Sequence, residues 1–155
     1  MRQGVFDVGL LQFIIMGDIS KNFSYKEFEN SDTAKRVGID NTIPYELRPN
    51  VKALVDNVLQ PLRDVWGVMK INSGYRCKRL NELVGGVETS QHASAEAADV
   101  ACSNPYALVK LAIDLNLPFD QIGLYDTFVH ISHKCNSKQR NQIFYDKSYK
   151  GAKLV

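Results

Sequence analysis

The sequence predicts an α+β domain in which a small, mainly antiparallel sheet is covered by helices. Two segments, 47–66 and 105–116, have apolar residues recurring at steps of three and four, which is typical of amphipathic helices. Short apolar runs bounded by Gly, Asn or Asp predict strands, most of them in the second half of the chain. The 155 residues, 45% of them apolar, suffice for one domain with a buried core.

The first helices are predicted from capping signals. Ser24 and Glu27 form a capping-box pattern, so a short helix is expected to run to about Asn30, and Ser31 offers the cap of a second helix. The long helix over 47–66 is expected to bend at Pro61 and to end at Gly67.

The remaining segments are expected to supply the sheet. A short strand is predicted at 68–72, one or two helical turns at 78–84 before Gly85-Gly86, and a buried strand at 97–102. Asn104-Pro105 starts the second main helix. The last elements are two hairpin strands and an edge strand, predicted at 121–125, 128–133 and 143–145.

Composition excludes several classes of protein. The 19 basic and 17 acidic residues are scattered and give a net charge of +2, so we expect no nucleic-acid interface. Three cysteines are too few for a disulfide scaffold, and we expect reduced, mostly buried thiols, with Cys102 filling the core. We expect a monomer.

The N-terminal residues 1–19 are expected to be an extension of the domain at 20–155. The apolar run at 8–16 is too short to span a bilayer and lacks a cleavage site. It is either an additional strand or the product of an over-called start, with translation beginning at Met16. The lack of a convincing signal peptide also fits a misassigned start.

Three polar residues stand out in strand-like or small-residue surroundings: His92, Asp99 and His130. Two imidazoles and one carboxylate are the three protein ligands of many catalytic zinc sites, in which water takes the fourth position. Strand alternation places His133 on the face opposite His130, so His133 is the weaker candidate. The alternative is that all three residues are structural and bind no metal.

Several separate segments, taken in order, resemble those of the zinc D-alanyl-D-alanine carboxypeptidases (peptidase family M15). This family includes phage endolysin peptidases and shares a zinc fold with hedgehog signalling domains. The resemblance covers roughly 20–133. It is carried by Ser73-Gly74-Tyr75-Arg76, by Asn81 with Val84-Gly85-Gly86, by Ser90-Gln91-His92 with Ala97-Ala98-Asp99, and by Phe128-Val129-His130-Ile131-Ser132.

The resemblance implies a zinc peptidase that cuts bonds next to D-amino acids in peptidoglycan stem peptides. His92, Asp99 and His130 would bind the zinc. Arg76 would orient the substrate or stabilise negative charge, because a guanidinium offers a rigid fork of donors. Ser90 would hydrogen-bond its own loop or a substrate carbonyl. Whether a terminal D-alanine or an internal cross-link is cut stays open. With this resemblance, the lack of a convincing signal peptide fits a phage lytic enzyme that is cytoplasmic until its release, or a protein with a misassigned start.

Two positions depart from the family pattern. Ala95 replaces a glycine, which matters if the backbone there needs a positive φ. Thr127 stands where many relatives have the carboxylate that acts as catalytic base. Asp126 is the nearest carboxylate, with Asp120 further back, and Asp126 is either that base or a hairpin-turn residue. The gap at Thr127 leaves a second function open, a zinc-containing binding domain without hydrolysis.

Overall fold

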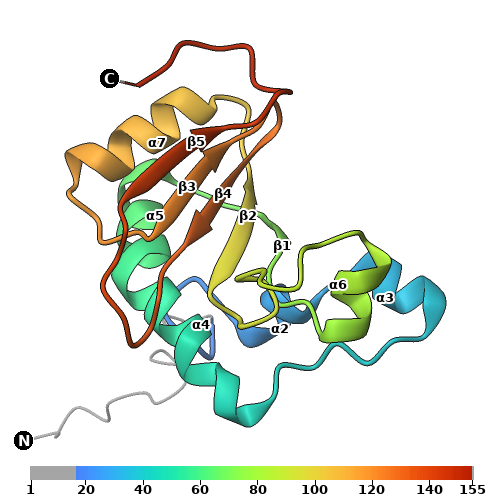
Figure 1. Ribbon diagram of the computed structural model, residues 1–155. Helices are drawn as coiled ribbons and strands as arrows, with labels where there is room; N and C mark the ends of the chain where they lie inside the picture. Colours follow the sequence, from blue (N-terminus) through green and yellow to red (C-terminus); the bar gives the residue numbers. More distant parts are fainter. Residues whose placement is uncertain (1–16, 155) are drawn as a thin grey trace, which may run out of the picture.

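The computed structural model describes residues 17–154, so most of the predicted extension at 1–19, including the proposed additional strand or over-called start, lies outside the described residues. A five-stranded sheet forms the centre of the fold, with strand order β1-β2-β4-β3-β5. All strand pairs are antiparallel except β3 with β5. Its strands are β1 (Ile71–Ser73), β2 (Ala97–Ala101), β3 (Gln121–Leu124), β4 (Phe128–Ser132) and β5 (Gln142–Tyr145). The predicted α+β class is confirmed (Figure 1).

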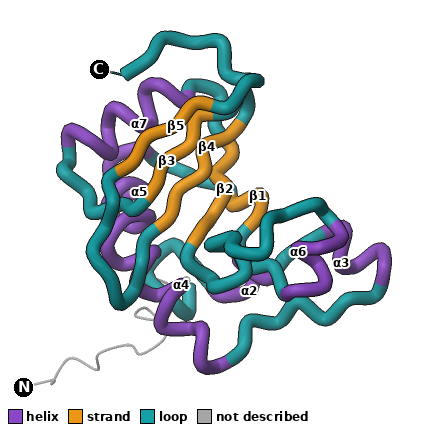
Figure 2. Tube along the Cα trace, in the orientation of Figure 1, coloured by secondary structure: helices purple, strands orange, loops and turns teal. Residues whose placement is uncertain are grey.

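Three short helices gather beside β1: α2 (Tyr25–Glu29), α3 (Asp32–Val37) and α6 (Lys78–Leu83) (Figure 1, Figure 2). The predicted capping box is present, since Glu27 accepts a hydrogen bond from the backbone of Ser24. Ser31 caps α3 by accepting from the backbone N–H of Ala34 at 3.1 Å. Both predicted helix starts are therefore confirmed.

The predicted long helix is confirmed but contains an irregular middle. It comprises α4 (Arg48–Leu54), a π-helical stretch (Val55–Leu59) and α5 (Gln60–Trp66), after a 3₁₀ turn (Tyr45–Leu47). Pro61 lacks a backbone N–H and its ring crowds the preceding turn, so a break in the hydrogen-bond ladder just before it is expected. Gly67 ends the helix with a φ of 105°.

The sheet has two faces of different character. On one face, the long helix and α7 (Pro105–Asp114) pack against strand side chains (Figure 1). The strand residues on this face are almost fully buried: Ala98, Val100, Ile122, Leu124, Val129 and Ile131. Because side chains alternate along a strand, Asp99 and His130 must lie on the opposite face, which these two helices do not cover.

Some predicted boundaries need correction. The strand expected at 68–72 begins at Ile71, because Met69 is taken into the core and Val68 is exposed. The parallel pairing of β5 with β3 was not predicted, although its edge position was. The thiols of Cys77 and Cys135 are only half-buried, since both residues lie in loops, so the expectation of mostly buried cysteines is wrong for them.

The described residues contain no helix that is long and apolar enough to cross a membrane.

Asp120 anchors the segment that leads to β5. Its side chain is fully buried, and both carboxylate oxygens accept from Arg140 Nε at 3.1 Å. Gln91 Nε2 also donates to it at 3.0 Å, and Lys134 Nζ lies 3.7 Å away. Burial raises the pKa of the Asp120 carboxyl, but hydrogen bonds from Arg140 outweigh this and lower the pKa to about 2. The carboxylate therefore joins three separate chain segments.

Replacing Asp120 with Asn tests this anchor. Because the folded-state pKa lies below the ordinary value, the carboxylate stabilises the fold above about pH 5 and loses this effect as the pH falls toward 2. We expect Asp120→Asn to lower the free energy of unfolding at pH 7 by roughly 1–2 kcal/mol, after allowance for the solvent exposure of Arg140. Urea unfolding from pH 7 to pH 2 measures it.

The curves for wild type and Asp120→Asn should converge toward pH 2. Asp114→Asn is the matched control, because Asp114 forms an exposed pair with Lys110 and should change stability little. Parallel curves for wild type and Asp120→Asn across this range would contradict the anchor.

Candidate metal centre

Three side chains from separate segments converge on the open face of the sheet: His92, Asp99 and His130. Asp99 on β2 and His130 on β4 are directly paired in the strand register, and His92 lies in the loop before β2. Asp99 Oδ1 is 2.9 Å from His130 Nδ1 and 3.3 Å from His92 Nε2. One ligand atom from each residue lies within 4.8 Å of the other two. The fold thus brings together the three residues predicted as ligands.

His92 is held by its ring and by its backbone. The side chain is buried, and Nδ1 donates to the carbonyl oxygen of Gly74 at 2.7 Å. A carbonyl can only accept, so the neutral ring carries its proton on Nδ1 and leaves the Nε2 lone pair facing Asp99. Gly74 itself cannot carry a side chain, because a Cβ there would lie 2.6 Å from the Cα of Phe28.

These donor atoms fit a catalytic zinc ion. Burial raises the pKa of Asp99, but the hydrogen bond from His130 and the neighbouring His92 imidazole outweigh it, so the pKa lies well below its ordinary value. Asp99 is therefore a carboxylate at neutral pH, as a metal ligand must be. Two imidazole nitrogens and one carboxylate oxygen give three protein ligands and leave a fourth position open.

Arg76 lies beside the cluster with hydrogen-bonding capacity to spare. It follows β1 and, together with Asp99, lines a hollow of about 350 Å³ that extends past Ser73 to Ser31 at the start of α3. Its Nε is buried and has no hydrogen-bond partner among residues 17–154. Burial lowers the pKa of Arg76 and the charge of Asp99 opposes this. The hollow therefore contains an unpaired cationic donor close to the metal ligands, suited to a carboxylate or oxyanion.

The loop that carries His92 is shaped by its own side chains. Asn81 Nδ2 donates to the carbonyl of Val87 at 2.8 Å, and Gly86 leaves room for that amide. A Cβ on Gly86 would lie 2.0 Å from Asn81 Oδ1. The Ser90 hydroxyl accepts from the backbone N–H of His92 at 3.3 Å. The structure thus gives Ser90 a contact within its own loop, one of its two predicted roles.

An aromatic group beside His130 was not predicted. Tyr125 stacks on Phe128 with ring centres 4.1 Å apart, and the Phe144 ring lies 6.1 Å from His130. Burial raises the pKa of Tyr125, Asp99 raises it further, and Arg76 lowers it, so the phenol feels both site charges. Strand alternation from Gly123, the register partner of His130, places Tyr125 on the metal face and was the signal available in the sequence.

The other candidate residues lie away from the cluster. Asp126 is exposed at the tip of the β3–β4 hairpin, where it lines a hollow with Asn104 and Tyr149, and its backbone N–H donates to Ser148 Oγ at 3.2 Å. Asp120 is occupied by its ion pairs. As predicted, His133 is not part of the cluster, and its Nδ1 donates to the Pro118 carbonyl at 2.6 Å.

The backbone at Ala95 has a φ of +60°, the left-handed conformation that favours glycine. This is the position at which the family pattern has glycine, so the departure has a physical cost. A left-handed conformation costs a non-glycine residue roughly 1–2 kcal/mol. Ala95 is nevertheless buried in the core, and the packing of its methyl group offsets part of that cost.

Ala95→Gly measures this strain. Losing a buried methyl group and adding glycine's backbone freedom together cost about 1–2 kcal/mol. At Ala95 the relief of the positive φ should cancel most of this loss. Ala112→Gly, at an equally buried helical position, should show the whole loss. We expect the two free energies of unfolding of the metal-free variants to differ by about 1 kcal/mol or more. Equal destabilisation would exclude strain at Ala95.

Comparison with known proteins gives one family match. The model of the family described as Peptidase M15 matches residues 21–132, more than two thirds of the chain. The matched range contains the three converging side chains, Arg76 and the aromatic residues Tyr125 and Phe128. No curated protein matches the chain significantly. The chain therefore belongs to the peptidase M15 family, a family of zinc-dependent metallopeptidases.

Proposed function

We propose that this protein is a zinc peptidase that hydrolyses peptide bonds next to D-amino acids in peptidoglycan stem peptides, as a D-alanyl-D-alanine carboxypeptidase or an endolysin-type endopeptidase. One observation carries the proposal. A three-ligand cluster with an open fourth position adjoins a hollow that contains the unpaired Arg76 guanidinium. The resemblance of the family motifs to those of D-alanyl-D-alanine carboxypeptidases supports the substrate class.

The zinc site would be formed by His92 Nε2, Asp99 and His130 Nδ1. When bound, zinc supplies an activated water and polarises the scissile carbonyl. The chain's own residues prepare this site: the Gly74 carbonyl holds the His92 ring, and the strand register holds Asp99 beside His130. Binding of the substrate falls to Arg76, whose free donors match a peptide carboxylate or the oxyanion formed during attack.

We assign proton donation to Tyr125. Its raised pKa keeps the phenol protonated at neutral pH, so it donates a hydrogen bond to the developing oxyanion or to the leaving amine. Asp126 remains the nearest carboxylate in the sequence, but its exposed place beside α7 supports the hairpin-turn role instead. Ser90 is assigned to its loop, and its O–H is left to donate to a substrate carbonyl.

Metal binding and cleavage are tested together. We expect about one zinc ion per purified molecule, since the site offers three protein ligands. The double variant His92→Ala with His130→Ala should lose the zinc, whereas His133→Ala should keep it. Elemental analysis measures the metal. Mass spectrometry of peptidoglycan digested by the zinc-loaded protein should then show new stem-peptide fragments, whose masses identify the bond.

A second function is favoured by one observation, that the cluster of potential ligands contains Asp99 as its single carboxylate. In that case the protein would bind zinc and act as a binding domain. A fully loaded protein that binds peptidoglycan but cleaves neither it nor D-alanyl peptides would favour this second function. Unchanged zinc content in the double histidine variant would contradict the proposed metal site itself.

The assignment of Tyr125 is tested against Asp126. Tyr125→Phe removes only the hydroxyl and should retain the zinc. It should lower kcat by roughly 10²-fold, the lower end of the range for the loss of a general acid or base. Asp126→Asn should leave kcat within about 2-fold of wild type, since turn residues on the surface contribute little. Steady-state hydrolysis of stem peptide measures both. The reverse pattern would make Asp126 the catalytic base and remove Tyr125 from the mechanism.

A further inference from the structure

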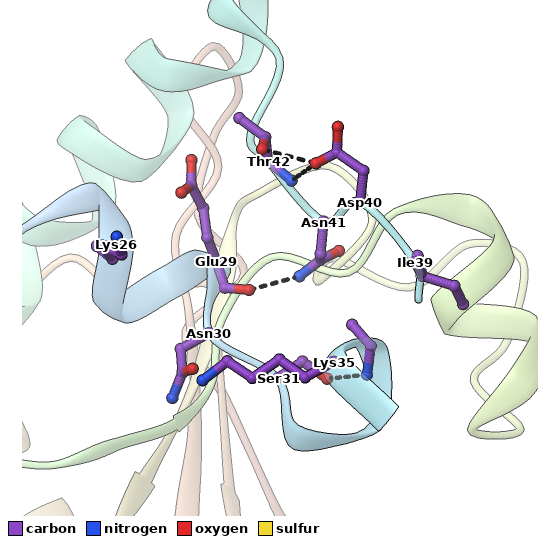
Figure 3. A pocket seen from close by; sticks show the side chains of 10 residues that line it. Lys26, Glu29, Asn30, Ser31, Lys35, Ile39, Asp40, Asn41 and Thr42 are labelled. Atoms are coloured by element: carbon purple, nitrogen blue, oxygen red, sulfur yellow. Dashed lines mark hydrogen bonds between the residues drawn. The ribbon is translucent and has the colours of Figure 1, made fainter. Parts of the chain in front are cut away.

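Asn41 is a buried amide remote from the metal ligands in sequence. It lies between α3 and the long helix, and its side chain makes three hydrogen bonds, all to backbone atoms. Nδ2 donates to the carbonyls of Glu29 and Tyr75, both at 2.9 Å, and Oδ1 accepts from the N–H of Cys77 at 2.8 Å. Figure 3 shows the bond to Glu29 at the edge of a hollow of about 230 Å³. Both hydrogens and the oxygen of this amide thus have backbone partners.

Two of these three partners, Tyr75 and Cys77, flank Arg76 in the sequence. The backbone on either side of that arginine is therefore fixed by one side chain. The N–H of Arg76 itself donates to the carbonyl of His92 at 3.0 Å. The N–H of Tyr75 donates to the carbonyl of Phe28 at 2.8 Å. The carbonyl of Cys77 also accepts from the N–H of Asn81 at 2.9 Å. Among the described residues, five hydrogen bonds thus hold the backbone of residues 75–77, and two of the five involve Asn41.

In the part of the chain that the structure describes, the guanidinium of Arg76 has no comparable support. Its Nε is buried and lacks a hydrogen-bond partner there, so hydrogen bonds at that atom do not fix its direction. The position of the Arg76 guanidinium relative to Asp99 then depends on the position of the backbone of residues 75–77. Displacement of a positioning group by about 1 Å can cost 10²-fold in rate.

We propose that Asn41 is a positioning residue for Arg76, holding the guanidinium at the distance from the metal ligands that substrate binding requires. This inference rests on the proposed function, in which Arg76 binds the substrate. The chemistry demands an amide, because the site needs two donors and one acceptor at a single short side chain. Aspartate cannot donate, and alanine offers neither function.

A double-mutant cycle with Arg76→Lys tests the proposal. Asn41→Ala should keep its zinc and lower kcat/KM for stem peptide by roughly 10-fold or more. If Asn41 acts through Arg76, the double variant should lose little beyond Arg76→Lys alone. The proposal would be overturned if the double variant lost the product of the two single losses in kcat/KM. It would also be overturned if Asn41→Ala kept the kcat/KM of the wild type. Thr42→Ala is the matched control, since Thr42 is an exposed neighbour whose hydroxyl donates to Asp40 and to no other described residue.

A second readout does not depend on hydrolysis. Calorimetric titration of the metal-free variants with stem peptide should show the same non-additive loss of affinity. If the zinc-loaded wild type binds stem peptide but does not cleave it, the proposed peptidase activity is refuted. The binding affinities of the variants still test the role of Asn41 in that case. Absence of binding as well would overturn both proposals.

A second variant serves as a control for loss of folding. Asn41→Asp keeps the shape and the acceptor for Cys77 but loses both donated bonds, and it should repeat the non-additive loss. Thermal unfolding shows whether each variant is folded at the assay temperature. Failure of both variants to fold would make Asn41 purely structural and overturn the proposal.

Discussion

The pairing of β2 with β4 is the constraint on which the site depends. Asp99 stands opposite His130, and the neighbouring pairs place Ala98 against Ile131 and Val100 against Val129 in the core. Burial of those apolar side chains therefore fixes the register that joins carboxylate and imidazole on the other face. A slip of one residue would turn Asp99 into the core and expose apolar residues, which the hydrophobic effect strongly disfavours.

The rest of the site is attached to this pair through backbone carbonyls. The Gly74 carbonyl orients the His92 ring, and the His92 carbonyl receives the N–H of Arg76. Through Phe28 the same segment is tied to α2. The short helices beside β1 thus form the support for one wall of the hollow. Their many polar contacts give directional placement, which apolar packing alone does not provide.

Two departures from the family pattern have different consequences: one affects stability and the other affects the chemistry of the site. Ala95 keeps the left-handed backbone that a glycine would adopt without strain, so the loop retains its shape at a cost in stability. Thr127 removes a carboxylate near the last ligand, and no change of backbone compensates for lost charge. What the structure supplies near that place is the Tyr125 phenol, whose pKa is raised by burial and by the charge of Asp99, so it can donate but not readily accept a proton.

The sequence by itself determined the α+β class, most helix and strand positions, and the choice of His92, Asp99 and His130 as candidate ligands, because periodicity, capping residues and motif order are local signals. Only the tertiary structure decided how the parallel β5 pairs, where Asp120 and Asp126 lie, that Asn41 bonds the backbone on both sides of Arg76, and that Tyr125 stacks on Phe128. Asn41 is separated from Tyr75 by 34 residues, and contacts across such distances depend on how the elements pack. Local propensity has no means of encoding that arrangement, which burial and register impose on the whole chain.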